Sequence, residues 1–203
     1  MDGKAQEKIK NDNGCCASGC RSNIVLLIKM SHINIEIKAK SANQEYIRKI
    51  LKSQNADFKG IDHQIDTYFK VSSGRLKLRE GNIENYLIYY KREDKSGPKQ
   101  SNVSLYNSIP NSSLKDILTK SLGVLAVVNK KREIYFIDNV KFHLDNVKNL
   151  GSFLEIEAID YKGDIGRKKL LSQCNYYMSL FKISKSDLIS ESYSNLLLKP
   201  GHK

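Results

Sequence analysis

Residues 33–40 read Ile-Asn-Ile-Glu-Ile-Lys-Ala-Lys. Apolar and polar side chains alternate throughout, which is the period of a β-strand with one buried face. The polar face is ionic, because Glu36 and Lys38 follow Asn34 on the same side of the strand. The stretch therefore predicts a strand that presents apolar side chains to a core and charged side chains to the opposite face of its sheet.

The same two-sided pattern recurs along the chain, and it predicts an α+β domain with eight antiparallel strands. The predicted strands are residues 33–40, 64–71, 75–80, 86–92, 124–136, 140–147, 153–159 and 193–198. Helices are predicted at 43–55, with Ser41 as its cap, at 113–122 and at 164–181. Residues 94–101 are predicted to form a polar loop, because they are hydrophilic and contain Gly97-Pro98.

The charges on the ionic faces segregate by strand. Arg75, Lys77 and Arg79 share one face with leucines between them, whereas Glu155 and Glu157 share another. Like charges on one face are destabilising unless something neutralises them. A one-sided sheet with a solvated charged surface is the simpler alternative, but such surfaces usually mix both signs. The segregation favours a closed sheet whose lumen binds phosphates at the bases and a divalent cation at the acids.

The composition agrees with one domain at residues 30–203 and an anionic partner. The 203 residues carry a formal net charge of +12, which suits a nucleic acid, a membrane surface or a phosphorylated small molecule. Because the bases alternate within strands, we expect a small triphosphate or nucleotide, with no nucleic acid and no membrane. Residues 1–29 are expected to form a disordered extension. Its Cys15, Cys16 and Cys20, with Cys174, form no disulfide framework, so we expect a cytoplasmic protein.

The acids suit a hard metal ion. Mg²⁺ takes carboxylate oxygens and often bridges to substrate phosphates, so Mg²⁺ or Mn²⁺ is the expected cofactor. The candidate metal ligands are Glu36, Glu155, Glu157 and Asp145.

An ordered series of short motifs resembles one known family. The series runs through Asn34-Ile-Glu-Ile-Lys38, Asp66-Thr-Tyr-Phe, Gly74-Arg-Leu-Lys-Leu-Arg79-Glu, Leu87-Ile-Tyr-Tyr-Lys-Arg92, Lys130-Lys-Arg132, His143-Leu-Asp145 and Glu155-Ile-Glu157. It resembles the CYTH domain, also called the triphosphate tunnel metalloenzymes, over residues 33–198. The family includes class IV adenylate cyclases, thiamine triphosphatases and inorganic triphosphatases. The resemblance implies an eight-stranded antiparallel barrel, open at both ends, with flanking helices.

The resemblance also implies roles for individual residues. Metal binding would fall to Glu36, Glu155 and Glu157, with Asp145 near the metal, and catalytic roles to Lys38, Glu36 and Asp145. The implied triphosphate ligands are Lys38, Arg75, Lys77, Arg79, Arg92, Lys130, Arg132 and Lys141. One departure is Asn34, which stands where the family motif begins with an acid, so one ligand oxygen would bring no charge.

Three functions remain open at this point. A metal-dependent triphosphatase is favoured over an adenylate cyclase, because the sequence identifies no adenine pocket. A non-catalytic phosphate-binding or nucleotide-binding module is the third. His143 is expected to line the site rather than to act as an acid or base.

Overall fold

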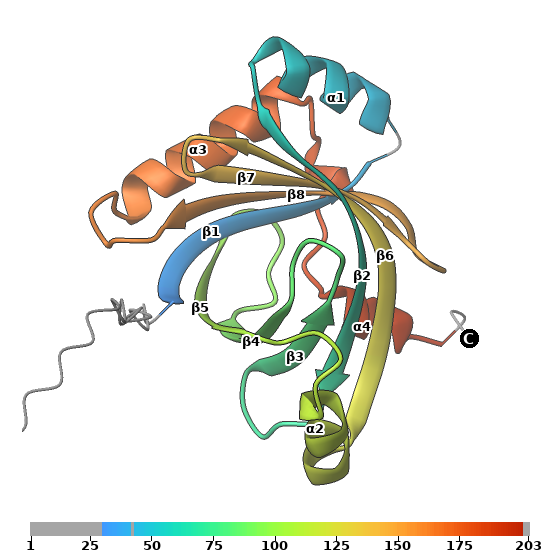
Figure 1. The fold of residues 1–203 in the computed structure, drawn as a ribbon. Coiled ribbons are helices and arrows are strands. Elements are labelled where there is room, and N and C mark those ends of the chain that lie inside the picture. The colour runs from blue at the N-terminus through green and yellow to red at the C-terminus, as the bar shows by residue number, and fades with distance from the viewer. Residues whose placement is uncertain (1–29, 42, 201–203) are drawn as a thin grey trace, which may run out of the picture.

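The computed structural model describes residues 30–41 and 43–200, and this part folds into one closed barrel with helices around it (Figure 1). The predicted extension, with its three cysteines, lies outside these residues. The strands are β1 (Met30–Lys40), β2 (Asp57–Phe69), β3 (Arg75–Glu80), β4 (Tyr86–Arg92), β5 (Lys99–Asn107), β6 (Val124–Ile137), β7 (Val140–Val147) and β8 (Gly151–Asp160). The helices are α1 (Gln44–Ser53), α2 (Leu114–Leu122), α3 (Arg167–Leu180) and α4 (Tyr193–Leu197), with a 3₁₀ turn η1 (Lys185–Asp187).

The eight strands follow the order β1-β5-β4-β3-β2-β6-β7-β8 around the barrel, and β8 pairs with β1 to close it. Every neighbouring pair is antiparallel. Closure pairs every strand on both sides, so the sheet has no unpaired edge strand. The predicted eight-stranded antiparallel barrel is confirmed.

The main apolar core lies outside the barrel, between its wall and two helices. Ile35, Phe142 and Ile156 of β1, β7 and β8 are almost fully buried there. Helix α3 lies along these strands (Figure 1), and the ring of its Tyr177 meets Phe142 edge to face at 4.7 Å between centroids. Burying one such side chain stabilises the fold by about 1.5–3 kcal/mol. The apolar side chains of these strands face this outer core. The charged side chains alternate with them and therefore face the lumen.

Two predictions about the elements were wrong, and their errors cancel in the strand count. Strand β5 begins at Lys99, inside the predicted polar loop. The sequence did not indicate this strand, because Val103 and Leu105 are its only aliphatic residues. The predicted last strand is instead helix α4, where the Ser192 hydroxyl accepts a hydrogen bond from the Asn195 backbone N–H at 3.2 Å.

The predicted boundaries at two other elements also need correction. Strand β2 begins at Asp57, earlier than predicted, and its pairing with β6 shifts register between Phe58 and Gly60. Helix α1 is capped by Asn43 rather than Ser41, since the Asn43 side chain accepts from the Tyr46 backbone N–H at 3.0 Å. In the part of the chain described, no helix is long and apolar enough to cross a membrane.

Candidate active site

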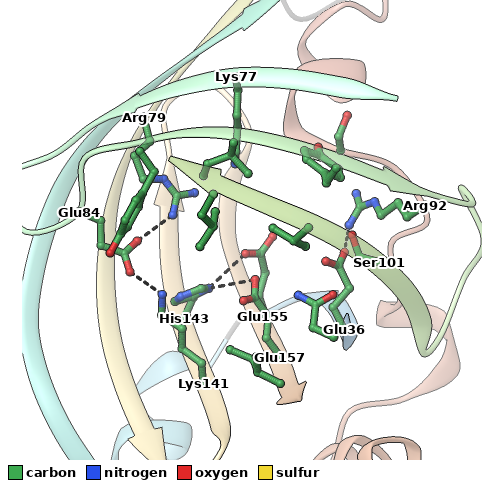
Figure 2. A pocket seen from close by; sticks show the side chains of 18 of the residues that line it. Glu36, Lys77, Arg79, Glu84, Arg92, Ser101, Lys141, His143, Glu155 and Glu157 are labelled. Atoms are coloured by element: carbon green, nitrogen blue, oxygen red, sulfur yellow. Dashed lines mark hydrogen bonds and ion pairs between the residues drawn. The ribbon is translucent and has the colours of Figure 1, made fainter. Parts of the chain in front are cut away.

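The barrel lumen holds one cavity of about 840 Å³, part of it open to solvent. Side chains from all eight strands line it, together with Glu84 from the β3–β4 connection and Tyr193 of α4. Its cationic lining consists of Lys38, Lys77, Arg79, Arg92, Lys130, Arg132 and Lys141. Its acidic lining consists of Glu36, Glu84, Glu155 and Glu157. Figure 2 shows several of them converging from opposite walls, among them Lys77 and Arg79 on one side and Lys141, Glu155 and Glu157 on the other.

The register of three neighbouring strands brings the acids together on one wall. Glu36 of β1 is directly opposite Glu157 of β8, and Lys38 is opposite Glu155. On the other side of β8, Glu155 is opposite His143 of β7. The Lys38 ammonium lies 2.9 Å from a Glu155 oxygen, so this lysine already compensates part of the acidic charge.

A compact metal-ligand set lies at this wall. Ligand atoms of His143, Glu155 and Glu157 all lie within 4.8 Å of one another. His143 Nδ1 is 3.3 Å from Glu155 and 3.7 Å from Glu157. Among the described residues, the buried Asn34 Oδ1 and His143 Nε2 have no hydrogen-bond partner. Such orphaned buried atoms are unfavourable unless a ligand satisfies them, so the donor set fits a divalent cation.

His143 stays neutral in this setting. Burial lowers its pKa, and the nearby Arg132 and Lys141 lower it further, against the opposing effect of Glu157. A neutral imidazole is the form that binds a metal. His143 was predicted only as a lining residue, and its place beside the two glutamates makes it a candidate ligand as well.

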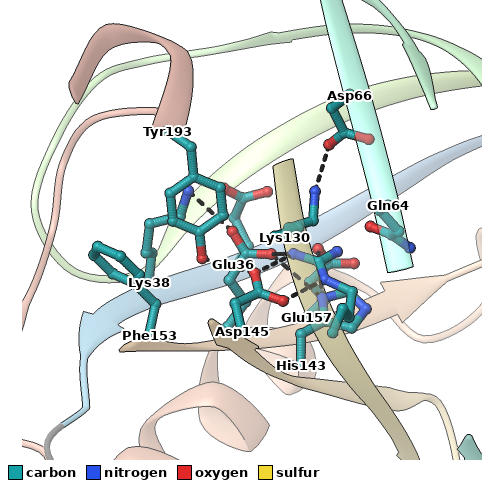
Figure 3. A network of polar contacts seen from close by, with 12 residues as sticks. Glu36, Lys38, Gln64, Asp66, Lys130, His143, Asp145, Phe153, Glu157 and Tyr193 are labelled. Carbon is teal, nitrogen blue, oxygen red and sulfur yellow. Dashed lines mark hydrogen bonds and ion pairs between the residues drawn. The ribbon is translucent and has the colours of Figure 1, made fainter. Parts of the chain in front are cut away.

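Asp145 lies behind the lining, in a buried polar network (Figure 3). Both of its oxygens accept hydrogen bonds from Arg132, and the Tyr193 hydroxyl donates to it at 2.8 Å. Arg132 also reaches Glu155 at 2.6 Å. The pKa of Asp145 is lowered, because Arg132 outweighs the effect of burial. Its oxygens are therefore occupied by protein donors, and the geometry gives it a positioning role toward Arg132.

Helix α4 places Tyr193 against one end of the lumen. The Lys38 ammonium lies 3.6 Å from the centre of the Tyr193 ring, and the Phe153 ring packs against the same tyrosine at 5.0 Å. A cation over an aromatic face is stabilised by the ring's negative potential. Tyr193 thus contacts both Lys38 and Asp145.

The fully buried Asp66 gathers three lumen cations. Its carboxylate accepts from Lys77 at 2.9 Å, from Arg79 at 2.9 Å and from Lys130 at 2.6 Å. Burial and the neighbouring Arg132, Arg79 and Lys77 lower the pKa of Lys130 to about 7, although Asp66 opposes the shift. Three cations around one carboxylate leave an excess of positive charge, which is the part of the lumen best suited to phosphate.

A further acid in the lumen is Glu84, which comes from the β3–β4 connection. It accepts from Arg79 at 2.7 Å and from Gln64 at 3.1 Å, and it forms an ion pair with Lys141. Glu36 forms an ion pair with Arg92. Each of these cations therefore has a carboxylate partner before any substrate arrives.

Most of the residues predicted from the sequence meet in this cavity, and two do not line it. Arg75 pairs with Asp94 outside the lining, and Asp145 lies behind it. The predicted residues in the lining are Glu36, Lys38, Lys77, Arg79, Arg92, Lys130, Arg132, Lys141, Glu155 and Glu157.

Sequence reasoning missed Asp66 and Glu84 as residues of the site. Asp66 lies on the same face of β2 as Gln64 and Tyr68, so the alternation of side chains along the strand could have indicated its place in the site. Glu84 lies in a connection and carries no periodic signal. Lys99 is 1% exposed and donates to the carbonyl oxygens of Ile189 and Ser190 at 3.2 and 3.1 Å.

Comparison with known proteins places this barrel among recognised relatives. The sequence profile of the CYTH domain matches residues 32–173, more than half of the chain. A Methanocaldococcus jannaschii protein named "Putative adenylate cyclase" is 28% identical over 179 residues, which cover 81% of this chain and 98% of the relative. A solved structure from Pyrococcus horikoshii OT3 is 27% identical with a TM-score of 0.65, covering 80% of this chain and 98% of that one.

A more distant structure shows the fold alone. A Vibrio parahaemolyticus protein of the same name as the archaeal relative has a TM-score of 0.65 at 16% identity, covering 82% of this chain and 98% of that chain.

Proposed function

The chain belongs to the CYTH family, and we propose that it is a metal-dependent phosphohydrolase that cleaves a triphosphate, inorganic or organic, inside its barrel. One observation carries the proposal: a single lumen joins a surplus of buried cations to a compact cluster of metal-ligand atoms. Phosphoryl transfer depends mainly on such positioning and charge stabilisation.

The cations hold the phosphate chain. Lys77 and Lys130, together on Asp66, and Lys38, over Tyr193, supply ammonium groups from different walls. Arg92 supplies a guanidinium that pairs with Glu36 in the absence of substrate. Because these groups are buried, their hydrogen bonds to phosphate oxygens are stronger than they would be in water.

The metal would be held by His143, Glu155 and Glu157, with the amide oxygen of Asn34 as an uncharged ligand. A bound Mg²⁺ or Mn²⁺ neutralises phosphate charge and makes a coordinated water more acidic. Asp145 fixes Arg132 beside Glu155, so that the guanidinium keeps one orientation. This division of roles keeps Asp145 in the site without making it a direct ligand.

The reaction is a displacement at the terminal phosphorus. The water oxygen forms a bond to that phosphorus, and the bond from the phosphorus to the bridging oxygen breaks. The bridging oxygen leaves with the shorter phosphate chain, and the water proton passes to a base. We assign that base to Glu36, whose carboxylate is released when Arg92 turns to the phosphates.

A class IV-type adenylate cyclase is the second candidate, and one feature of the cavity favours it. Away from Tyr193, the lining includes Tyr86, Ile88, Leu105 and Tyr161, which offer an apolar surface to an organic group. In that reaction the ribose 3′-hydroxyl attacks the α-phosphorus and pyrophosphate leaves. A Hippeastrum protein with a dominant triphosphatase activity shares only the fold, at 13% identity and a TM-score of 0.53.

Product analysis tests the proposal. Purified protein is incubated with Mg²⁺ or Mn²⁺ and, separately, with inorganic triphosphate, thiamine triphosphate and ATP, and orthophosphate, pyrophosphate and cyclic AMP are quantified. The proposal predicts orthophosphate release that the Glu155→Gln/Glu157→Gln double variant loses. Glu45→Gln on the exposed face of α1 is the matched control.

The other outcomes are equally informative. Cyclic AMP with matching pyrophosphate would replace the hydrolase by the cyclase. Binding without any product would leave a phosphate-binding module and contradict the proposed catalysis.

A further inference from the structure

The β3–β4 connection, residues 81–85, is fixed rigidly at one end of the lumen. The buried Asp62 carboxylate accepts from the backbone N–H groups of Ile83 at 2.9 Å and Glu84 at 3.0 Å. Gly81 passes so close to Asp62 that an added Cβ would lie 2.6 Å from its oxygen. The Asn85 side chain bonds both the N–H and the carbonyl of Gly81, at 3.2 and 2.9 Å.

This anchoring aims the Glu84 side chain into the lumen. Gln64 donates to Asp62 at 2.7 Å and to Glu84 at 3.1 Å, so one amide links the anchor to the projecting carboxylate. The Glu84 side chain is only 12% exposed. A carboxylate held by so many contacts cannot swing aside without breaking several hydrogen bonds.

Glu84 bridges two distant walls of the barrel (Figure 2). Its partners are Arg79 on β3 and Lys141 on β7, and strands β2 and β6 lie between those two strands in the barrel order. The Glu84–Lys141 ion pair therefore crosses the lumen, whereas the Glu84–Arg79 pair joins the connection to the strand that precedes it. At this point the tunnel contains a fixed negative charge with its own cations.

The charge balance differs between the two parts of the lumen. Around Asp66, one carboxylate faces Lys77, Arg79 and Lys130. Around Glu84, the carboxylate is matched by Lys141 and by Arg79, which it shares with Asp66. A phosphate entering the first part meets unneutralised cations, whereas one entering the second part meets a like charge, which is costly in a desolvated site.

We propose that Glu84 ends the phosphate path and limits the length of the polyphosphate chain that the tunnel accepts. This inference rests on the proposed function and adds a specificity-determining residue to it. With the carboxylate in place, Arg79 and Lys141 are unavailable to an additional phosphate. Without its charge, both cations are free to bind one more phosphate group.

The test compares chain-length preference in wild type, Glu84→Gln and Glu84→Ala. Dissociation constants for pyrophosphate, triphosphate and linear tetraphosphate are measured by calorimetry in EDTA, where hydrolysis does not proceed. Glutamine keeps the hydrogen bond from Arg79 but removes the charge, and thermal unfolding checks that each variant is folded. Glu80→Gln is the control, because its partner Lys115 lies outside the lumen.

The inference predicts that Glu84→Gln strengthens binding of tetraphosphate relative to triphosphate by about tenfold, with no such change in Glu80→Gln. An unchanged ratio in folded Glu84 variants would overturn it, whether or not wild type releases orthophosphate in Mg²⁺. A changed ratio without orthophosphate release from wild type would support it and refute the hydrolysis. A wild type that binds none of the three chains would overturn it as well.

Discussion

The replacement Asp66→Asn tests whether Asp66 compensates the positive charge of the lumen. Lys77, Arg79 and Lys130 converge on this buried carboxylate. Removing one partner from a buried ion pair costs about 3–5 kcal/mol, because the remaining charges lose their compensation. For a domain of this size, 1 kcal/mol shifts Tm by about 2–4 °C, so the expected loss is about 6–20 °C. Lys130 has a pKa of about 7, so it can lose its proton in the variant and leave one charge fewer without a partner. The loss in Tm would then lie near the lower end of this range.

Inorganic triphosphate should reverse much of this loss. The variant lacks the internal anion, so an added polyanion gains more from the three cations than it does in wild type. Differential scanning fluorimetry with and without triphosphate measures both effects. Asp57→Asn, on the same strand and paired with Lys59 at the surface, is the matched control. A variant as stable as this control, or equal protection of both proteins by triphosphate, would show that Asp66 does not compensate the three cations.

Three further predictions follow from individual positions in the barrel. Burial lowers the pKa of Lys130 in the folded state to about 7, so above this pH the native state binds fewer protons than the unfolded state and the contribution of Lys130 to stability rises with pH. Denaturation from pH 7 to 10 should therefore show a slope in wild type that exceeds that of Lys130→Met by up to about 1.4 kcal/mol per pH unit; equal slopes would contradict the assignment. Asn34→Glu adds a charge to the ligand set and should tighten Mn²⁺ binding about tenfold or more, and calorimetry showing weaker or unchanged binding would exclude Asn34 from the site. Gly81→Ala forces a Cβ against Asp62 and should lower Tm, whereas an unchanged Tm would show that the connection is not held as described.

The sequence predicted which side chains face the lumen in those strands whose two faces differ clearly in polarity. In β1 and β8, Ile and Leu alternate with charged residues, and parity alone assigned Glu36, Lys38 and Glu155 to one side. The segregation of bases and acids on different strands then favoured a closed, ionic lumen over a sheet with one solvated face. The resemblance to the CYTH domain added the expectation of an eight-stranded barrel that is open at both ends.

Other features of the site depend on tertiary contacts, and the alternation of side chains along a strand does not reveal them. Strand β5 is mostly polar, and it is a strand because β1 and β4 both pair with it. Glu84 lies in a connection, where no period relates side-chain direction to sequence. Asp145 has the parity of a lumen residue, yet Arg132 and Tyr193 occupy its oxygens. Such competition between partners depends on the folded arrangement and leaves no local sequence signal.

A crystal structure with inorganic triphosphate and Mn²⁺ would show whether the lumen binds both the phosphate chain and the metal. Anomalous scattering locates the metal independently of the phosphates. We expect a manganese peak beside Glu155 and Glu157, with the phosphate chain held by Lys38, Lys77 and Lys130 within the barrel. Phosphate density confined to the outer surface, or a metal bound away from these two glutamates, would contradict it.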